Sequence, residues 1–157
     1  MMGVAGSGKT TIGRLLAAEL GWRFVEGDDL HTAAAVEQMR AGRPLTDADR
    51  ESWIASLHAI IAAAADRREP LILSCSALKE RYRRALRGDL HGVRFVYLKA
   101  DQDALGRRLA ERAGHFAGPA LLPSQLAALE PPDDAITIDG TRPPDQIVHT
   151  IRRELGL

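Results

Sequence analysis

The stretch that decides the fold is GVAGSGKT, residues 3–10, which fits the phosphate-binding pattern G-x-x-x-x-G-K-[ST] of a P-loop. Glycines let the backbone N–H groups of such a loop converge on phosphates, and the following helix directs the positive end of its dipole at them. We expect Lys9 to reach the β- and γ-phosphates of a nucleoside triphosphate, and the Thr10 hydroxyl to bind Mg²⁺. The predicted nucleotide-binding residues here are Gly3, Val4, Ala5, Gly6, Ser7, Gly8, Lys9, Thr10 and Thr11. The alternative is a plain glycine-rich turn, which does not account for the fact that every fixed position of the pattern is filled.

Downstream of this loop, short apolar runs alternate with longer helical patterns. Strands are predicted over 22–25, 71–74, 93–98 and 135–138, and helices over 12–20, 33–41, 47–66, 77–87, 103–113, 124–129 and 144–155, with Asp47 as N-cap of the long one. This alternation predicts an α/β fold with a mainly parallel sheet, whose ligands bind at the carboxyl ends of the strands. A P-loop normally follows a complete strand, but only Met1 and Met2 precede it here, so we expect a truncated first strand.

Length and charge limit the function further. The 157 residues fit one domain that can bury a core without disulfides, and the 21 basic residues balance the 21 acidic ones. A sequence-independent nucleic-acid binder would need a basic excess, and no apolar run approaches the ~20 residues of a membrane span. The lone Cys75 cannot form an internal disulfide and is interpreted as a small buried residue. We therefore expect a soluble, cytoplasmic protein that binds neither nucleic acid nor membrane.

Polar residues follow the predicted strands. In GDDLH, residues 27–31, Asp28 can accept the proton of an attacking hydroxyl or hold Mg²⁺ through water, and His31 can hydrogen-bond a polar acceptor molecule. A solvated turn and a structural histidine are the alternatives. In GRPLTDADR, residues 42–50, Arg50 can pair with an anionic group; a capped helix with a first-turn salt bridge and a core Trp53 explains the stretch equally well.

The segment SCSALK, residues 74–79, brings hydroxyls and a cation to the exit of the next strand. Ser76, Lys79 and Arg83 suit an oxygen-rich anionic ligand, and the spacing of Lys79 and Arg83 places them on one helix face. At the last strand exit, Arg142 can border the adenine, although a plain turn accounts for it nearly as well.

Residues 112–124 are rich in Gly and Pro and are flanked by cations, which is typical of a lid. Lids exclude water, and their arginines stabilise the charge of a transferring phosphate. We expect Arg112 to act in catalysis, Arg108 to bind nucleotide and His115 to contact substrate. An exposed helix followed by an irregular loop is the alternative.

Taken together, these stretches resemble the gluconate kinases of the small P-loop sugar-kinase type. The resemblance covers nearly the whole chain. Its motifs are the P-loop, then GDDLH at 27–31, P-L-T-D-x-D-R-x-x-W at 44–53, C-S-A-L-K-x-x-Y-R at 75–83, R-x-G-H-F at 112–116, and L-L-x-S-Q-x-x-x-L-E at 121–130. The P-loop is shared with a very large superfamily, whereas the C-S-A-L-K and G-H-F segments are much more specific. One departure is the run TAAA at 32–35, where the family pattern has a Pro and an Asn.

The resemblance implies a three-layer, adenylate-kinase-like P-loop kinase fold with a five-stranded parallel sheet in one domain over residues 1–157. It implies transfer of phosphate from ATP, with Mg²⁺, to the 6-hydroxyl of D-gluconate by cytoplasmic enzymes that are often dimers. The implied catalytic residues are Lys9, Asp28 and Arg112. The implied substrate residues are Asp28, His31, Arg50, Ser76, Lys79, Arg83, His115 and Gln125. The alternatives are a kinase for shikimate or a nucleoside monophosphate, or a nucleotide-binding regulatory domain without catalysis.

Overall fold

The computed structural model describes residues 1–111 and 118–157. The helices are α1 (Lys9–Leu20), α2 (Ala33–Arg40), α3 (Asp47–Asp66), α4 (Glu80–Arg87), α5 (Gln102–Glu111), α6 (Leu122–Ala128) and α7 (Pro144–Leu155). The strands are β1 (Arg23–Glu26), β2 (Leu71–Ser74), β3 (Val96–Lys99) and β4 (Ile136–Asp139), and the 3-10 turns are η1 (Gly27–Leu30) and η2 (Pro119–Leu121). Helices and strands alternate as the sequence predicts.

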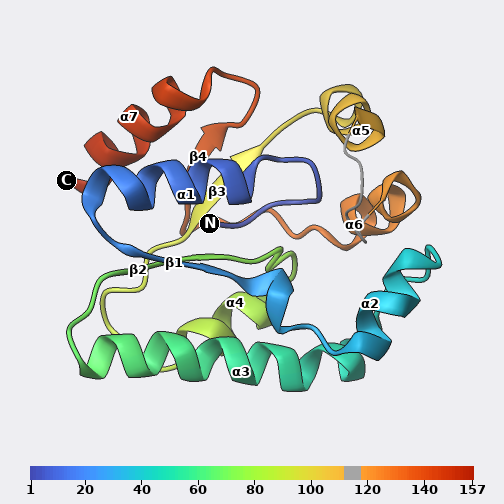
Figure 1. Ribbon diagram of the computed structural model, residues 1–157, viewed down its shortest axis with the longest axis horizontal. Coiled ribbons are helices and arrows are strands. Elements are labelled where there is room, and N and C mark those ends of the chain that lie inside the picture. Colours follow the sequence, from blue (N-terminus) through green and yellow to red (C-terminus); the bar gives the residue numbers. More distant parts are fainter. Residues whose placement is uncertain (112–117) are drawn as a thin grey trace.

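The strands form two parallel pairs with the N-terminal segment between them. β1 pairs with β2, and β3 pairs with β4. Residues 1–3 lie between the pairs (Figure 1): the Cys75 N–H donates to the Met1 carbonyl at 3.0 Å, and the Leu98 N–H donates to the Met2 carbonyl at 3.0 Å. The predicted five-stranded sheet is therefore wrong for the residues described here. The N-terminal segment makes one β-bridge, Met2 to Tyr97, rather than a strand.

Helices cover the strands on both sides and give three layers (Figure 1). α1 and α7 pack on one side of the strands, through buried residues such as Leu16, Leu98 and Ile151. α3 and α4 pack on the other side, through Leu57, Leu86 and their neighbours. A third apolar cluster joins the P-loop to α2, α5 and α6. α1, α3, α4 and α7 bury apolar faces against the strands, whereas α2, α5 and α6 pack in the cluster beside the P-loop.

The starts of α3 and α4 differ from the prediction in ways that affect the site. Thr46, not Asp47, is the N-cap of α3: its hydroxyl accepts from the Asp49 N–H at 3.2 Å, and the Asp49 carboxylate accepts from the Thr46 N–H at 2.8 Å. This reciprocal capping box leaves Asp47 free to bind other groups. α4 begins at Glu80 rather than at Ala77, because Ala77 has a φ of 44°, outside the helical region.

Candidate active site

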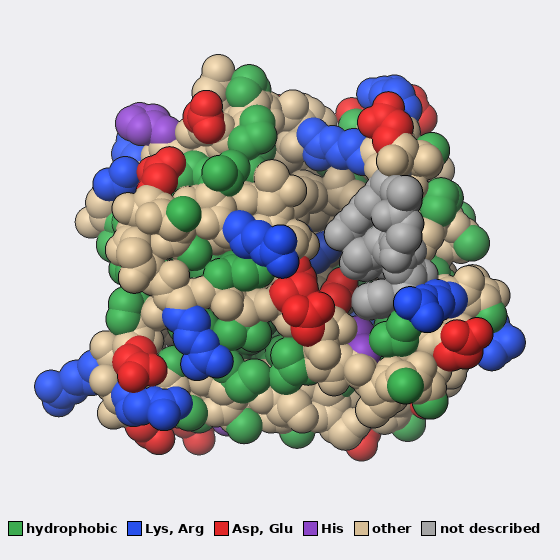
Figure 2. Space-filling model, viewed as in Figure 1, with side chains coloured by type: hydrophobic (Ala, Val, Ile, Leu, Met, Phe, Trp, Pro, Cys, Tyr) green, Lys and Arg blue, Asp and Glu red, His purple; other side chains and the backbone are tan. Residues whose placement is uncertain are grey.

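A cleft of about 720 Å³ opens at the carboxyl ends of the strands, between the P-loop and the starts of α3 and α4. Its position agrees with the strand-exit rule. The predicted residues that line it are Ala5, Gly6, Ser7, Gly8, Lys9, Thr10, Thr11, Asp28, His31, Arg50, Ser76, Lys79, Arg108, Gln125 and Arg142. On the face shown in Figure 2, basic and acidic side chains are intermixed, in agreement with the zero net charge. Arg112 and His115 lie outside the described residues.

The backbone of the P-loop adopts conformations that require glycine. Gly3 has a φ of +143°, and a Cβ there would lie 2.8 Å from the Leu98 carbonyl oxygen, so a larger residue would displace the adjoining strand. Gly8, with a φ of 96°, is the N-cap of α1. Val4 is buried and supports the loop from below. The Lys9 ammonium donates to the Val4 carbonyl at 3.0 Å, so the lysine folds back over its own loop.

Two arginines border the loop at the other end of the cleft. Arg108, on α5, approaches the Gly6 carbonyl at 3.5 Å. Arg142 follows β4 in a turn closed by the Asp139 carboxylate, which accepts from the Thr141 N–H at 2.9 Å and from the Thr141 hydroxyl at 2.6 Å. These hydrogen bonds hold the pKa of Asp139 below its usual value. Both arginines line the cleft together with the P-loop.

Asp28 lies in η1 and His31 directly follows it; Trp53 of α3 contacts both the turn and His31. The indole N–H of Trp53 donates to the Gly27 carbonyl at 2.8 Å, and the His31 ring stacks on the Trp53 ring with centroids 4.2 Å apart. His31 Nε2 lies 3.9 Å from a carboxylate oxygen of Asp28. Burial lowers the pKa of His31, against the opposing effect of Asp28, and so favours the neutral imidazole. Trp53 is buried, as the capped-helix interpretation of residues 42–50 expects.

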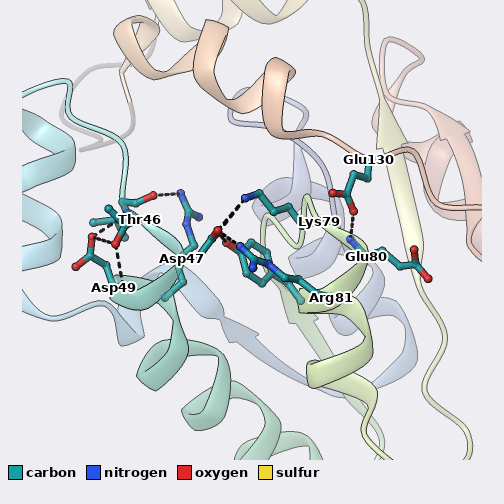
Figure 3. A network of polar contacts seen from close by, with 10 residues as sticks. Thr46, Asp47, Asp49, Lys79, Glu80, Arg81 and Glu130 are labelled. Atoms are coloured by element: carbon teal, nitrogen blue, oxygen red, sulfur yellow. Dashed lines mark hydrogen bonds and ion pairs between the residues drawn. The ribbon is translucent and has the colours of Figure 1, made fainter.

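The opposite wall of the cleft is a cationic cluster around Asp47 and Tyr82 (Figure 3). The Lys79 ammonium lies 2.9 and 3.2 Å from the two Asp47 oxygens, and Arg81 and the Tyr82 hydroxyl also bind this carboxylate. The buried Tyr82 ring is approached by the cations of Arg81 at 5.2 Å, Lys79 at 5.9 Å and Arg50 at 5.9 Å. Sequence reasoning did not assign Asp47 or Tyr82 to the site. The signal was the capping box of Thr46 and Asp49: with Thr46 as the N-cap of α3, Asp47 is not needed as a cap and is a candidate for the site.

Arg50 differs from the other two cations of this cluster. Asp47 pairs with Lys79 and Arg81, whereas Arg50 donates to the Leu45 carbonyl at 3.4 Å and lies over the Tyr82 ring. Within the described part of the chain its guanidinium is therefore matched by a carbonyl and a ring, not by a carboxylate. Arg50 also lines the cleft.

Arg83, which the sequence placed beside the ligand, lies elsewhere in the structure. Its side chain is buried and donates to the carbonyls of Ala77 at 3.1 Å and Leu78 at 3.0 Å. The expectation of a shared face with Lys79 assumed that both residues are helical. Because α4 begins at Glu80, Lys79 is the N-cap, and Arg83 closes the turn that precedes the helix.

Gln125 contacts the P-loop directly. Its side-chain oxygen accepts from the Ala5 N–H at 2.6 Å. The helix that carries it, α6, begins at Leu122 rather than at the predicted Ser124, because Leu121 and Leu122 are buried and Pro123 suits the first turn. Ser76 supports the loop from the other side, since its carbonyl accepts from the Gly3 N–H at 3.2 Å.

The residues present fit a magnesium ion that arrives with a nucleotide. Thr10 lines the cleft at the start of α1, and the Asp28 carboxylate lies on the same cleft. Mg²⁺ is usually held by one or two protein oxygens together with phosphates and water, which this donor set supplies. Residues 1–111 and 118–157 contain no cluster of three His, Cys, Asp or Glu side chains that could hold a metal unaided. In the same ranges, no helix combines the length and the apolar character needed to cross a bilayer.

A P-loop at the start of a helix, parallel strands between two helical layers, and a cleft that continues into a cationic wall define the class of P-loop kinases. A model of the AAA domain family matches residues 1–132. The chain is 46% identical to the gluconokinase of Gluconobacter oxydans, over 98% of this chain and 88% of that one. It is similar to the crystal structure of a sugar kinase from Janibacter, with a TM-score of 0.91, 41% identity, and 99% and 91% of the two chains covered. A gluconokinase structure from Sinorhizobium meliloti gives a TM-score of 0.87, 39% identity, and 99% and 89% covered.

The chain belongs to the gluconokinase family.

Proposed function

We propose that this protein transfers the γ-phosphoryl group of ATP to the 6-hydroxyl of D-gluconate, forming 6-phospho-D-gluconate in the cytoplasm. The observation that carries the proposal is a cleft that is lined both by the P-loop and by the cations Arg50 and Lys79. Relatives named gluconokinase that match nearly the full chain support the same conclusion. Gluconate carries one carboxylate and several hydroxyls, so it requires a cation and several hydrogen-bonding groups.

The donor end binds the triphosphate. Backbone N–H groups of the P-loop bind the phosphates, apart from those of Gly3, Ala5 and Ser7, which donate to other groups of the protein. Lys9 exchanges its bond to the Val4 carbonyl for the β- and γ-phosphates. Arg108 and Arg142 flank the nucleotide, and Thr10 holds the Mg²⁺ that comes with it. When bound, this ion neutralises charge on the phosphate oxygens.

The acceptor end binds the sugar acid. Arg50 pairs with the carboxylate, because its charge is not already bound by Asp47 as that of Lys79 is. Lys79, His31, Ser76 and Gln125 line the same cleft and hydrogen-bond the hydroxyls, with neutral His31 able to donate or accept. Arg112 and His115, outside the described residues, take the lid roles expected from the resemblance. Arg83 is not part of this proposal.

The transfer step needs a proton acceptor and alignment more than covalent help. The 6-hydroxyl oxygen forms a bond to the γ-phosphorus while the bond from that phosphorus to the bridging oxygen of ADP breaks. Asp28 accepts the hydroxyl proton. Trp53 and His31 hold the turn that carries Asp28, so the carboxylate has a defined place before substrate binds.

The test is an acceptor screen that follows ADP release with gluconate, shikimate and AMP, using wild type and Lys9→Ala. We expect turnover with gluconate alone, and loss of turnover in Lys9→Ala with the fold intact by circular dichroism. Preference for shikimate or AMP would assign another small-molecule kinase. ATP binding without turnover on any acceptor would indicate a regulatory domain, and near-normal activity of Lys9→Ala would reject the P-loop role.

A further inference from the structure

Residues 122–130, consisting of α6 and the two residues after it, contact both ends of the cleft; we call them the α6 strut. At the donor end, the Gln125 side-chain oxygen accepts from the Ala5 N–H of the P-loop at 2.6 Å. At the acceptor end, the Glu130 carboxylate accepts from the Glu80 N–H at 2.6 Å, the first amide of α4 (Figure 3). The Glu130 N–H also donates to the Leu78 carbonyl at 2.9 Å. One short segment therefore joins two parts of the site that lie far apart in sequence.

The donors and acceptors available at the two ends of the α6 strut fix how Gln125 and Glu130 bond. The Ala5 N–H is a donor, so the carboxamide of Gln125 must present its oxygen to the loop, and its NH₂ group keeps two donors for a ligand in the cleft. The first amides of α4 have no partner within the helix. The N-cap residue Lys79 has an ammonium group, which cannot accept a hydrogen bond. Glu130 supplies that acceptor from 50 positions away, and its negative charge also suits the N-terminal end of the helix dipole.

Apolar packing makes the strut part of one body with the groups it joins. Leu122 belongs to the same buried cluster as Ala5 of the P-loop and Leu78 before α4, and Leu126 packs against that cluster. A segment held by a hydrogen bond at each end and by a shared apolar cluster between them keeps a fixed distance from loop to helix.

We propose that the α6 strut sets the position of the P-loop relative to α4, with Gln125 and Glu130 as positioning residues for phosphoryl transfer. This inference rests on the proposed function, because the start of α4 carries the acceptor residue Lys79. Transfer requires the attacking oxygen and the γ-phosphorus to be in line, and a displacement of about 1 Å can cost roughly a hundredfold in rate. Releasing either end of the strut changes that distance without removing a group that touches the reacting atoms.

The experiment compares wild type, Gln125→Met, Glu130→Ala and the double variant in kcat and in KM for both substrates. Each single variant is expected to lose about tenfold in kcat, equivalent to one hydrogen bond. Both KM values should stay nearly unchanged in Glu130→Ala, whereas KM for gluconate should also rise in Gln125→Met, because methionine lacks the carboxamide donors that face the cleft. The double variant is expected to lose little more than the worse single variant, because a strut released at one end no longer positions anything. Glu130→Gln keeps an oxygen for the Glu80 N–H and is expected to recover most of the rate.

Asp134→Ala is the matched control. It breaks the exposed pair between Asp134 and Arg87, at 2.7 Å, which also ties α4 to the segment after the strut but lies at the far end of the helix. Its kcat is expected to equal that of wild type. If the losses instead multiply to about a hundredfold in the double variant, the two contacts act independently and the strut is refuted. An unchanged kcat in either single variant refutes it as well.

Wild-type turnover on gluconate separates this inference from the proposed function. Absence of that turnover refutes the proposed function, and the same four proteins are then compared in the hydrolysis of ATP by water. If the rate losses of the two single variants multiply in the double variant in that reaction, the strut is refuted. If the double variant loses little more than the worse single variant, the strut is supported.

Discussion

Lys79 and Arg83 lie four residues apart, yet the same substitution in each is expected to have opposite consequences. Lys79 lines the cleft and its side chain is 29% exposed, whereas Arg83 is 5% exposed and bonded to backbone carbonyls. Lys79→Met should therefore alter substrate binding, and Arg83→Met should alter stability. Methionine keeps most of the apolar stem of either side chain, so the comparison isolates the cationic head.

The cost of Arg83→Met follows from its two acceptors. The Leu78 carbonyl also accepts from the Glu130 N–H at 2.9 Å and keeps that partner, so the loss falls on the carbonyl of the buried Ala77. An unsatisfied buried acceptor costs about 1–3 kcal/mol, and removing the desolvated charge offsets part of this. We expect the free energy of unfolding to fall by roughly 2 kcal/mol, which for a chain of this size is about 4–8 °C in melting temperature.

The cost of Lys79→Met falls on binding instead. Its partner Asp47 has a side chain that is 43% exposed, so solvent screens the ion pair, and the stability change is expected to stay below about 1 kcal/mol. A lost charged hydrogen bond to the acceptor corresponds to an increase of about tenfold or more in KM for gluconate, with KM for ATP unchanged.

Urea unfolding and steady-state kinetics of Lys79→Met and Arg83→Met test these two expectations. Arg84→Met, in which an exposed side chain loses only its pairing with Glu80, is the control for a missing cation on α4 and should change neither quantity. The reasoning is refuted if Arg83→Met unfolds at the wild-type urea midpoint while raising KM for gluconate as much as Lys79→Met does.

Three further outcomes are expected. Asp28→Asn should lower kcat about a hundredfold or more and leave the melting temperature unchanged; a shift in melting temperature with normal kcat would mark Asp28 as structural. Burial keeps the pKa of His31 in the folded state below the unfolded value of 6.5, so wild-type stability should fall as pH decreases through and below that value. In His31→Phe, which keeps the stack on Trp53, that part of the pH profile should flatten, and an unchanged slope would contradict the assignment. Burial raises the pKa of the Cys75 thiol to about 12, so a disulfide reagent at pH 8 should label the protein only after denaturation.

The donor end could be predicted from the sequence because its residues are contiguous. Gly3, Gly8, Lys9 and Thr10 occupy fixed places in one short motif, and the backbone that the motif needs is available mainly to glycine. Alternation of apolar runs likewise predicted the order of helices and strands. The five-stranded sheet implied by the resemblance was wrong for the described residues, whereas the expectation of a truncated first strand agrees with the single bridge that this segment makes.

The acceptor end could not be predicted in the same way, because it depends on where two helices begin. A one-residue difference in the cap of α3 decides whether Asp47 caps that helix or binds Lys79. A three-residue difference at the start of α4 decides whether Arg83 faces a ligand or the backbone. Helix boundaries are the least certain part of sequence interpretation, and no local motif links α3 to α4 across the cleft.

The position of Asp47 explains how a cationic wall can be specific rather than merely attractive to anions. Three cations around one ring would repel one another and move, and they would attract any anion. Asp47 binds Lys79 and Arg81, and the Tyr82 hydroxyl binds Asp47, so two of the three charges are fixed by the protein itself. On the proposed function, the remaining charge, on Arg50, matches the single carboxylate of gluconate. The side chains of the wall are then ordered before the substrate arrives, so binding does not have to meet the free-energy cost of ordering them.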